Sequence, residues 1–368
     1  MLYRTHPSTG LSLSVIGFGG MRFANPDDPD ACAALMLAAY DAGINYFDTA
    51  IGYGKSEELF GHALKAMKPT RAARPFYVAS KTFANTADDL RRDLETSLTR
   101  MGLDYLDFYH FWCLLSPEAY RQRKGILREF EQLKAEGLIR HIAVSSHMSG
   151  DEIRVMLEDY PFESILLGYS PMNFLYREPA LNAAAAQGIG VIAMNPLGGG
   201  IIPQHPDRFA FLKSRDDETV VEAALRFLIH DPRITTALVG FSTDAQVREA
   251  VRAVDGFVPL TDERLAAMRA GMTASFDTMC TGCQYCDQCP VELPIPKLMD
   301  AYNQYLLSGK TQDIANRLSW HWSLLKERDY FDRCTACGAC EAVCTQHLPI
   351  IARIREVGDA AETALAKK

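Results

Sequence analysis

Short β-rich runs alternate with amphipathic stretches along most of the chain, and this alternation constrains the fold more than any other feature. The stretches between the runs, such as residues 88–95 and 127–134, have the apolar spacing of helices with one buried face. Eight strands, each followed by a helix, predict a closed parallel (β/α)8 TIM barrel, because a doubly wound open sheet usually has fewer strands. The eight runs lie at residues 13–19, 45–50, 76–82, 106–112, 141–147, 164–170, 190–196 and 236–241.

The barrel accounts for only part of the chain. The sequence has 368 residues, whereas a barrel of this kind takes about 250. After residue 254 the pattern changes, and Pro259-Leu260-Thr261-Asp262 indicates a linker followed by a helix N-cap. We therefore expect a barrel over residues 1–258 and a mostly helical domain over residues 259–368. A turn at Ser8-Thr9-Gly10 predicts a hairpin that closes the bottom of the barrel.

The charge balance excludes several classes of function. Lys and Arg number 38 and Asp and Glu number 46, so the formal net charge is −8. Nucleic-acid and anionic-membrane binding both need a basic surface, so neither is expected as the main task. No apolar run approaches the ~20 residues of a membrane helix, and residues 1–7 show no apolar stretch of the signal-peptide kind. A cytoplasmic protein is the expectation.

Eight of the ten cysteines lie between residues 280 and 344, which points to metal ligation rather than to a disulfide framework. Three thiolates at successive three-residue steps can hold three corners of a 4Fe-4S cluster, and a fourth cysteine commonly ligates the partner cluster. This rule predicts two clusters in a ferredoxin-like domain. One would be held by Cys280, Cys283, Cys286 and Cys344, and the other by Cys334, Cys337, Cys340 and Cys289.

Zinc is the alternative, because two Cys-x2-Cys pairs suffice for one four-cysteine zinc site. Runs of four cysteines are better explained by iron–sulfur chemistry. The chain departs twice from the bacterial ferredoxin pattern. Two residues rather than three separate Cys286 from Cys289, and Thr345 stands where proline usually follows the last cysteine. The division of the ligands between the clusters is therefore less firmly indicated than the clusters themselves.

Three polar residues lie at or just after the ends of the predicted second and third strands, where barrel enzymes place their catalytic residues. Asp48 and Lys81 end these strands, and Tyr53 lies in the loop after the second. An ammonium group beside a phenol favours the phenolate and lowers the tyrosine pKa, and a carboxylate keeps the ammonium charged. This set is therefore expected to deliver a proton.

These segments resemble the aldo-keto reductase family. The resemblance is carried by DTAIGYGKSEELFG (residues 48–61), Gly19-Gly20-Met21-Arg22, residues 134–141 and residues 195–200. The cysteine tail, with Cys280-Thr281-Gly282-Cys283, is similar to that of the branch with a C-terminal ferredoxin-like dicluster domain. The resemblance implies a barrel that binds a nicotinamide cofactor without a Rossmann domain and reduces carbonyls by hydride transfer.

The catalytic pattern departs from the family at one position. The family's histidine at the end of the fourth strand aligns with Trp112, whose indole donates one hydrogen bond but does not titrate. His110 lies two residues, about 6.6 Å, further down the strand and is expected to be a buried barrel residue. His147, after the fifth strand, is the candidate for an alternative catalytic group at the barrel mouth.

The expected nicotinamide contacts are also altered. Ser145 and Ser146 stand in place of a Ser-Asn pair, Leu166 in place of a glutamine and Met194 in place of a stacking tyrosine. No basic residue matches the family's usual lysine for a 2′-phosphate, so NADP(H) and NAD(H) both remain open. The phosphate and adenosine contacts implied by the resemblance are Asn195, Pro196, Leu197 and Gly198, and then Gly240, Phe241, Ser242, Gln246 and Glu249.

The sequence thus predicts an iron–sulfur oxidoreductase that reduces a carbonyl or related small molecule with a nicotinamide. Its two 4Fe-4S clusters would exchange electrons with an electron-transfer protein partner. Because nicotinamides move two electrons together and clusters move one, the alternative is a redox-sensing or electron-transfer module that uses the barrel for binding. In a third reading the clusters only stabilise the fold.

Overall fold

The computed structural model describes residues 1–273 and 278–366. The chain divides into two compact units, one of Met1–Leu197 with Leu212–Leu265 and the other of Gly198–Phe211 with Ala266–Lys368. Helix α11 (Asp262–Thr273) begins in the first unit and ends in the second. Among the described residues, no helix is both long and apolar enough to span a bilayer.

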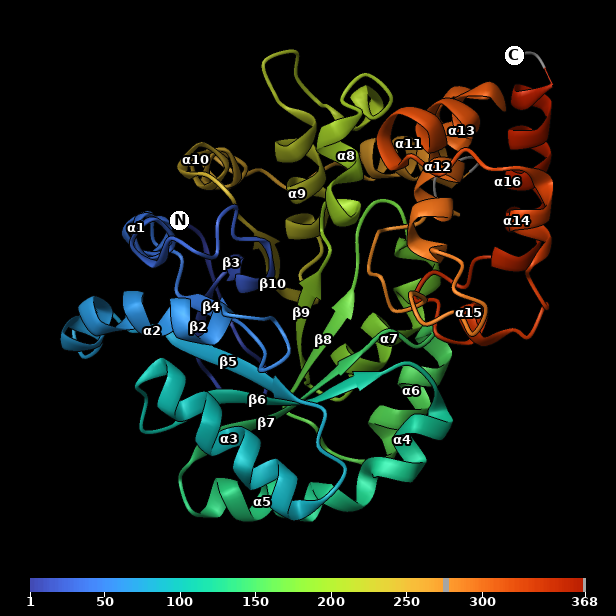
Figure 1. Ribbon diagram of the computed structural model, residues 1–368. Coiled ribbons are helices and arrows are strands. Elements are labelled where there is room, and N and C mark those ends of the chain that lie inside the picture. The colour runs from blue at the N-terminus through green and yellow to red at the C-terminus, as the bar shows by residue number, and fades with distance from the viewer. Residues whose placement is uncertain (274–277, 367–368) are drawn as a thin grey trace. The chain divides into compact units, whose positions relative to one another are not determined.

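The first unit contains the predicted barrel (Figure 1), in which parallel strands close in the order β10-β3-β4-β5-β6-β7-β8-β9. The prediction of a (β/α)8 barrel is therefore confirmed. Each strand overlaps one of the eight predicted runs. The strands are β3 (Ile16–Gly19), β4 (Tyr46–Asp48), β5 (Tyr77–Thr82), β6 (Leu106–Leu114), β7 (Ile139–Ser146), β8 (Ser164–Gly168), β9 (Gly190–Met194) and β10 (Ile234–Gly240).

The helices that follow the strands begin at the caps that their sequences provide. Thr86 accepts a hydrogen bond from the Asp89 backbone at the start of α3, and Thr219 forms a capping box with Glu222 at the start of α9. The helices of this unit are α1 (Pro29–Asp41), α2 (Ser56–Met67), α3 (Ala87–Met101), α4 (Pro117–Arg123), α5 (Leu127–Ala135), α6 (Gly150–Asp159), α7 (Phe174–Ala186), α9 (Val220–His230) and α10 (Asp244–Arg252).

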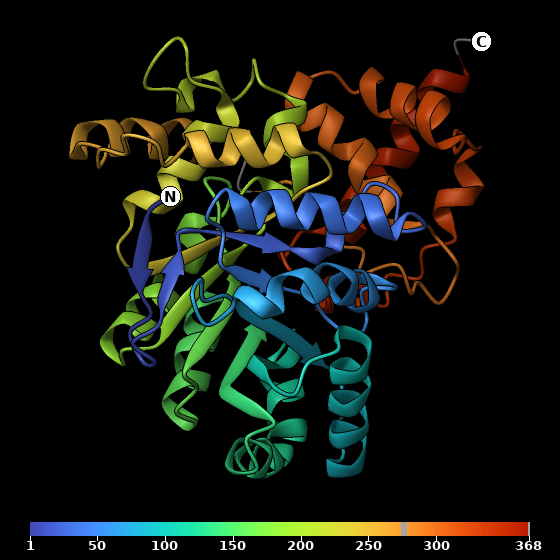
Figure 2. The ribbon, with the colours of Figure 1, turned by 90° about the vertical axis from the view of Figure 1, so that its left-hand side faces the viewer.

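A layer of buried side chains fills the barrel interior, as expected for this architecture. It consists of Leu13, Tyr46, Ala79, Phe108, Ala143, Leu166, Ile192 and Leu238. The expected N-terminal hairpin is also present, and its two antiparallel strands are β1 (Tyr3–Thr5) and β2 (Ser12–Ser14), dark blue in Figure 2. Because Leu13 of β2 belongs to the buried layer, the hairpin covers the interior of the barrel.

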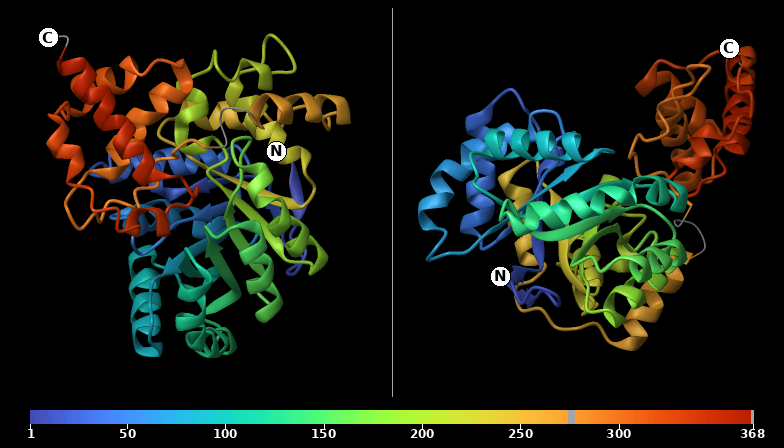
Figure 3. Two further views of the ribbon diagram at one scale, coloured as in Figure 1. Left: turned by 90° about the vertical axis from the view of Figure 1, so that its right-hand side faces the viewer. Right: turned by 90° about the horizontal axis from the view of Figure 1, so that it is seen from below.

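The second unit is helical in the part of the chain described, as predicted for the C-terminal domain (Figure 3, orange to red). Its core is an apolar cluster that includes Leu298 and Met299 of one helix and Ile350, Ile354 and Val357 of another. Several cluster cysteines pack against this core. The helices are α8 (Ile201–Gln204), α12 (Ile295–Ser308), α13 (Gln312–Arg317), α14 (Arg328–Asp332), α15 (Ala339–Ala342) and α16 (Ile350–Leu365), with a π-helical turn at Leu318–Trp322.

Candidate active site and metal centre

A buried ion pair lies at the carboxyl ends of β4 and β5. The Lys81 ammonium group pairs with the Asp48 carboxylate and donates a second hydrogen bond of 2.6 Å to the Thr49 carbonyl. The two side chains are 0% and 2% exposed. Burial raises the pKa of Asp48 and lowers that of Lys81, and the attraction between the two groups opposes both shifts. The structure thus brings together two residues that lie 33 positions apart in the sequence.

Tyr53 lies beside this pair. The Lys81 nitrogen is 4.8 Å from the centroid of the Tyr53 ring. Burial, then the negative charge of Asp48, raises the pKa of Tyr53; the positive charge of Arg22 opposes the rise, and the lowering that we expected from Lys81 is not found. The physical reason is that removal of the phenolate from water costs more than the nearby cation returns. Tyr53 therefore keeps its proton at neutral pH, which is the form that a proton donor needs.

Trp112 forms an aromatic wall next to Tyr53. Its ring stacks on Phe83 with centroids 3.7 Å apart and meets the Tyr53 ring edge-on with centroids 5.4 Å apart. A Cβ atom added to Gly52 would lie 3.1 Å from both Phe83 and Trp112. Trp112, which we expected at the position of the family's histidine, therefore contacts the candidate proton donor and offers it an apolar surface.

His110 is buried in the barrel interior, as expected, but it lies closer to the ion pair than the sequence suggested. It pairs in register with Lys81, and its Nε2 atom is 3.9 Å from Asp48 Oδ2. Burial and the charge of Lys81 lower its pKa well below the usual value. Neither ring nitrogen has a hydrogen-bond partner among the described residues. The signal that sequence reasoning missed was the β5–β6 register, which places position 110 opposite position 81.

The serines expected at the nicotinamide end β7, and they differ in their bonding. Ser146 Oγ donates to the Leu114 carbonyl and accepts from the Met148 backbone, whereas the buried Ser145 Oγ has no hydrogen-bond partner in the described part of the chain. An unpaired buried hydroxyl fits a site that holds a polar ligand group. His147 is buried, and burial together with the charge of Arg177 lowers its pKa to about 3.

The loop after β9, expected to face the cofactor phosphates, has unusual backbone geometry. Asn195, Gly198, Gly199 and Gly200 all have positive φ angles, of 55°, 61°, 69° and 101°. A Cβ on Gly199 would lie 2.1 Å from the carbonyl oxygen of Thr281, so glycine is required there. Pro196 is buried and Leu197 is half-buried.

The expected adenosine segment follows β10. The Ser242 backbone donates to Gln246 Oε1 at 2.7 Å, and Thr243 with Gln246 forms the capping box of α10. Phe241 is buried with its ring centroid 5.5 Å from that of Phe18. Gln246 and Phe241 thus already have structural roles, while Glu249 is half-buried on the same helix. Gly240 is exposed, and a Cβ there would lie 2.7 Å from the Arg22 side chain.

The second unit gathers one of the two expected cysteine sets around a cavity. The cavity is small, about 10 Å³, and Met299, Leu348 and Ile350 also line it. Backbone N–H groups of Gly282 and Leu348 donate to the sulfurs of two of the cysteines at 3.4 Å. Such N–H···S bonds suit thiolates that carry a cluster. The four cysteines at this cavity are Cys280, Cys283, Cys286 and Cys344.

The other set is more open to solvent. Cys337 is exposed, whereas Cys289, Cys334 and Cys340 are half-buried against the apolar core. The Arg333 guanidinium donates to the Val291 carbonyl, which ties the segment after Cys289 to the segment that carries Cys334. Burial and the nearby Glu341 raise the pKa of Cys340 to about 11.

The cysteine geometry fits a cluster better than a single ion. Among residues 1–273 and 278–366, no three His, Cys, Asp or Glu side chains converge closely enough to bind one metal ion. Thiolates around a 4Fe-4S cluster lie at its separate corners, so they need a cavity between them rather than a common point. Burial raises the pKa values of Cys280 and Cys286 to about 12, so metal binding there must displace thiol protons.

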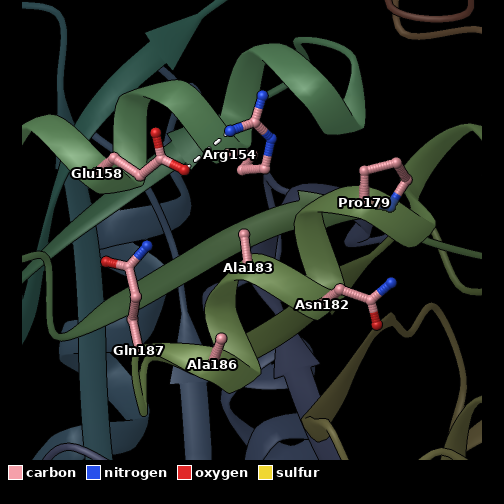
Figure 4. A pocket seen from close by; sticks show the side chains of 7 residues that line it. All are labelled: Arg154, Glu158, Pro179, Asn182, Ala183, Ala186 and Gln187. Carbon is pink, nitrogen blue, oxygen red and sulfur yellow. Dashed lines mark hydrogen bonds and ion pairs between the residues drawn. The ribbon is translucent and has the colours of Figure 1, made fainter.

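A separate pocket lies on the outside of the barrel between α6 and α7 (Figure 4). Arg154 and Glu158, which pair at 2.8 Å, and Asn182 and Gln187 are among its lining residues. None of the candidate catalytic side chains lines it. We therefore assign it no part in the chemistry of the strand ends.

Comparisons with known proteins place this geometry in a family. The model of the aldo/keto reductase family matches residues 15–271, and that of the 4Fe-4S dicluster domain matches residues 279–348. The chain therefore belongs to the aldo/keto reductase family, is an oxidoreductase and carries a C-terminal iron–sulfur domain. The family uses nicotinamide cofactors.

Several known proteins match about two thirds or more of the chain. The chain is 28% identical to L-galactose dehydrogenase of Arabidopsis thaliana, over 67% of this chain and 86% of that protein. It is 26% identical to 6-dehydroglucose reductase of Novosphingobium aromaticivorans, over 68% and 90% of the two chains. It is 25% identical to the NADH-specific methylglyoxal reductase of Escherichia coli, over 71% and 93%. The structure of an aldo-keto reductase from Bacillus halodurans in its holo form has a TM-score of 0.63 at 24% identity, covers 74% of this chain and 96% of its own, and shows a shared fold.

Proposed function

We propose that this protein reduces the carbonyl group of a small hydroxylated compound with a nicotinamide, in connection with two 4Fe-4S clusters. The observation that carries the proposal is the contact of Tyr53 with the buried Lys81–Asp48 pair at the strand ends. Several relatives are named for reactions of sugars, such as L-galactose dehydrogenase. The Phe83 ring, which stacks on the buried Trp112 and is 47% exposed, offers a flat apolar surface for the non-polar face of a sugar.

In this proposal Tyr53 acts as the proton donor. A bound nicotinamide supplies the hydride that adds to the carbonyl carbon. Tyr53, which burial keeps protonated, gives its proton to the carbonyl oxygen, so that the carbonyl becomes an alcohol. The positive charge of Arg22 offsets part of the negative charge left on the phenol oxygen. Asp48 holds the Lys81 ammonium group over the Tyr53 ring. Ser145, with its unpaired hydroxyl, is proposed to bind the nicotinamide amide.

The two cysteine sets support a role in electron transfer. Reduction of NADP⁺ or NAD⁺ to the dihydronicotinamide takes two electrons and one proton, which equals one electron from each of two clusters and a proton from solvent. We propose that an electron-transfer protein exchanges these electrons with the more exposed second set, where Cys337 reaches the surface.

The test uses the full chain, purified without oxygen. The protein is reduced with dithionite, freed of excess reductant, and mixed with NADP⁺ or NAD⁺. We expect one dihydronicotinamide per chain, together with the return of the oxidised cluster absorbance. Titration with NADPH and NADH should show saturable binding of at least one of them. The absence of binding at millimolar concentrations of both would contradict the reductase proposal.

A second candidate function follows from Trp112. Its indole stands where a titratable histidine is expected and packs on Tyr53, which favours, as the alternative, a barrel that serves as a binding module whose clusters sense redox state. The Tyr53→Phe variant separates the two functions. In a reductase this variant should abolish carbonyl reduction while it leaves nicotinamide binding and iron content unchanged. In a sensing module the substitution should change none of these three properties.

A further inference from the structure

Arg353 of α16 is a buried cation. Its residue is 4% exposed, and its guanidinium carbon lies 4.7 Å above the ring of Tyr302 on α12. Its Nη1 atom is buried without a hydrogen-bond partner among the described residues. A buried charge is costly unless a partner of opposite charge compensates it. A negatively charged group close to Nη1 would therefore stabilise the buried guanidinium.

The elements that hold Arg353 also form the walls of the first cysteine cavity. Ile350, one turn earlier on α16, lines that cavity. Asn303, the neighbour of Tyr302 on α12, donates to the Cys280 carbonyl at 2.8 Å and accepts from the Cys280 backbone at 2.9 Å. Arg353 is thus anchored beside one of the four cysteines by the same two helices that shape the cavity.

The charge of Arg353 acts on this cysteine set. Burial lowers the pKa of Arg353, and electrostatic attraction to Tyr302, Cys280, Cys344 and Glu356 opposes that lowering. Cys280 and Cys344 both line the cavity. When those thiols become thiolates of a cluster, the cation gains negative charges beyond the Glu356 carboxylate, which accepts a hydrogen bond from Tyr302 at 2.8 Å.

The second set has charges of both signs nearby and is more open to solvent. Burial and the negative charge of Glu341 raise the pKa of Cys340, the Arg333 guanidinium bonds the Val291 carbonyl, and Cys337 is exposed. Near the first set the Asp300 carboxylate is paired with Arg317 at 2.7 Å. The described residues thus place a buried cation with one unpaired nitrogen, Nη1 of Arg353, near the first set.

We propose that Arg353 compensates part of the charge of the first cluster and raises its reduction potential. A cluster that accepts one electron gains one negative charge, so a nearby fixed cation favours the reduced form. The inference rests on the proposed assignment of Cys280, Cys283, Cys286 and Cys344 to one cluster.

The test measures the two potentials by EPR-monitored titration of the full chain with dithionite. Arg353→Met should decrease the equilibrium constant for reduction of the first cluster at least about tenfold, or 59 mV for one electron. Arg353→Lys, which keeps the charge, should restore most of it. Arg355, exposed on the same helix, gives the control variant Arg355→Met. Cys337→Ser, in the second set, assigns the signals because it should alter only the second.

Iron content separates failure of this inference from failure of the proposed function. If Arg353→Met keeps its full iron and both potentials stay within about twofold of the wild type, Arg353 has only a structural role and the inference is wrong. An equal shift in Arg355→Met would also overturn it, since the effect would then be a general one of net charge. If the methionine variant loses iron, Arg353→Gln, which keeps a donor without the charge, provides the same comparison. Absence of iron from the wild-type chain would instead reject the cluster assignment itself.

Discussion

Removal of the Lys81 ammonium group should reveal how strongly the barrel depends on its buried ion pair. In the Lys81→Met variant the side-chain volume is nearly kept, but Asp48 loses its cation and the Thr49 carbonyl loses a donor. Because Asp48 is 2% exposed, water cannot replace the lost partner. The carboxylate must then remain as an isolated buried charge or take up a proton.

Loss of one partner from a buried ion pair typically costs about 3–5 kcal/mol of unfolding free energy. Replacement of both partners by apolar groups removes the stranded charge, so the double variant Asp48→Leu/Lys81→Met should be more stable than the sum of the single effects by about 2 kcal/mol or more. A cost of this size is a large share of the ~5–15 kcal/mol that stabilises a typical fold.

The assay is urea unfolding of the full chain, followed by far-UV circular dichroism at neutral pH for the wild type, both single variants and the double variant. Lys55→Met is the matched control, because Lys55 pairs with Asp27 at 2.6 Å on the surface and should change the midpoint little. If the single costs simply add in the double variant, the two groups do not interact as a buried pair. A Lys81→Met midpoint equal to that of Lys55→Met would refute the reasoning as well.

Three further predictions concern the metal, the aromatic wall and pH. Protein purified without oxygen should contain about eight irons and eight sulfides per chain. The Cys283→Ala variant should contain about half of that iron and sulfide, with the barrel still folded. Stoichiometric zinc with no iron would contradict the assignment of iron–sulfur clusters. Trp112→His should raise kcat/KM for simple aldehydes by up to about 10²-fold by restoring a donor to the carbonyl oxygen, and an unchanged rate would mean that the wall does not limit the reaction. Burial lowers the pKa of His147 to about 3. Between pH 6.5 and 3 the unfolded chain therefore binds a proton that the folded chain does not. The unfolding free energy should decrease by about 1.4 kcal/mol for each unit by which the pH is lowered through this range. In pH-dependent urea unfolding, His147→Gln should decrease the slope of the unfolding free energy against pH by about 1.4 kcal/mol per pH unit, while the buried His6 and His110, whose pKa values are also lowered, keep their contributions. A slope identical to that of the wild type would count against a buried neutral His147.

The sequence predicted the parts of this protein that depend on local pattern. The short β-rich runs and the helical spacing between them are properties of neighbouring residues, so the barrel strands were predicted at nearly the positions observed. The cysteine spacing likewise indicated iron–sulfur ligation, because a cluster needs thiolates at short, regular steps along the chain.

Only the tertiary structure decided the properties that depend on burial and on distant segments. The register of β5 with β6 brings His110 opposite Lys81 and within 3.9 Å of Asp48, and no local pattern indicates a pairing register. Burial raises the pKa of Tyr53 against the pull of a nearby cation, because the cost of desolvation depends on every surrounding atom. The sequence likewise does not distinguish Arg353 from the other charged residues of an amphipathic helix. Its place above Tyr302, beside the cavity that Cys280 and Cys344 line, follows from the packing of α12 against α16.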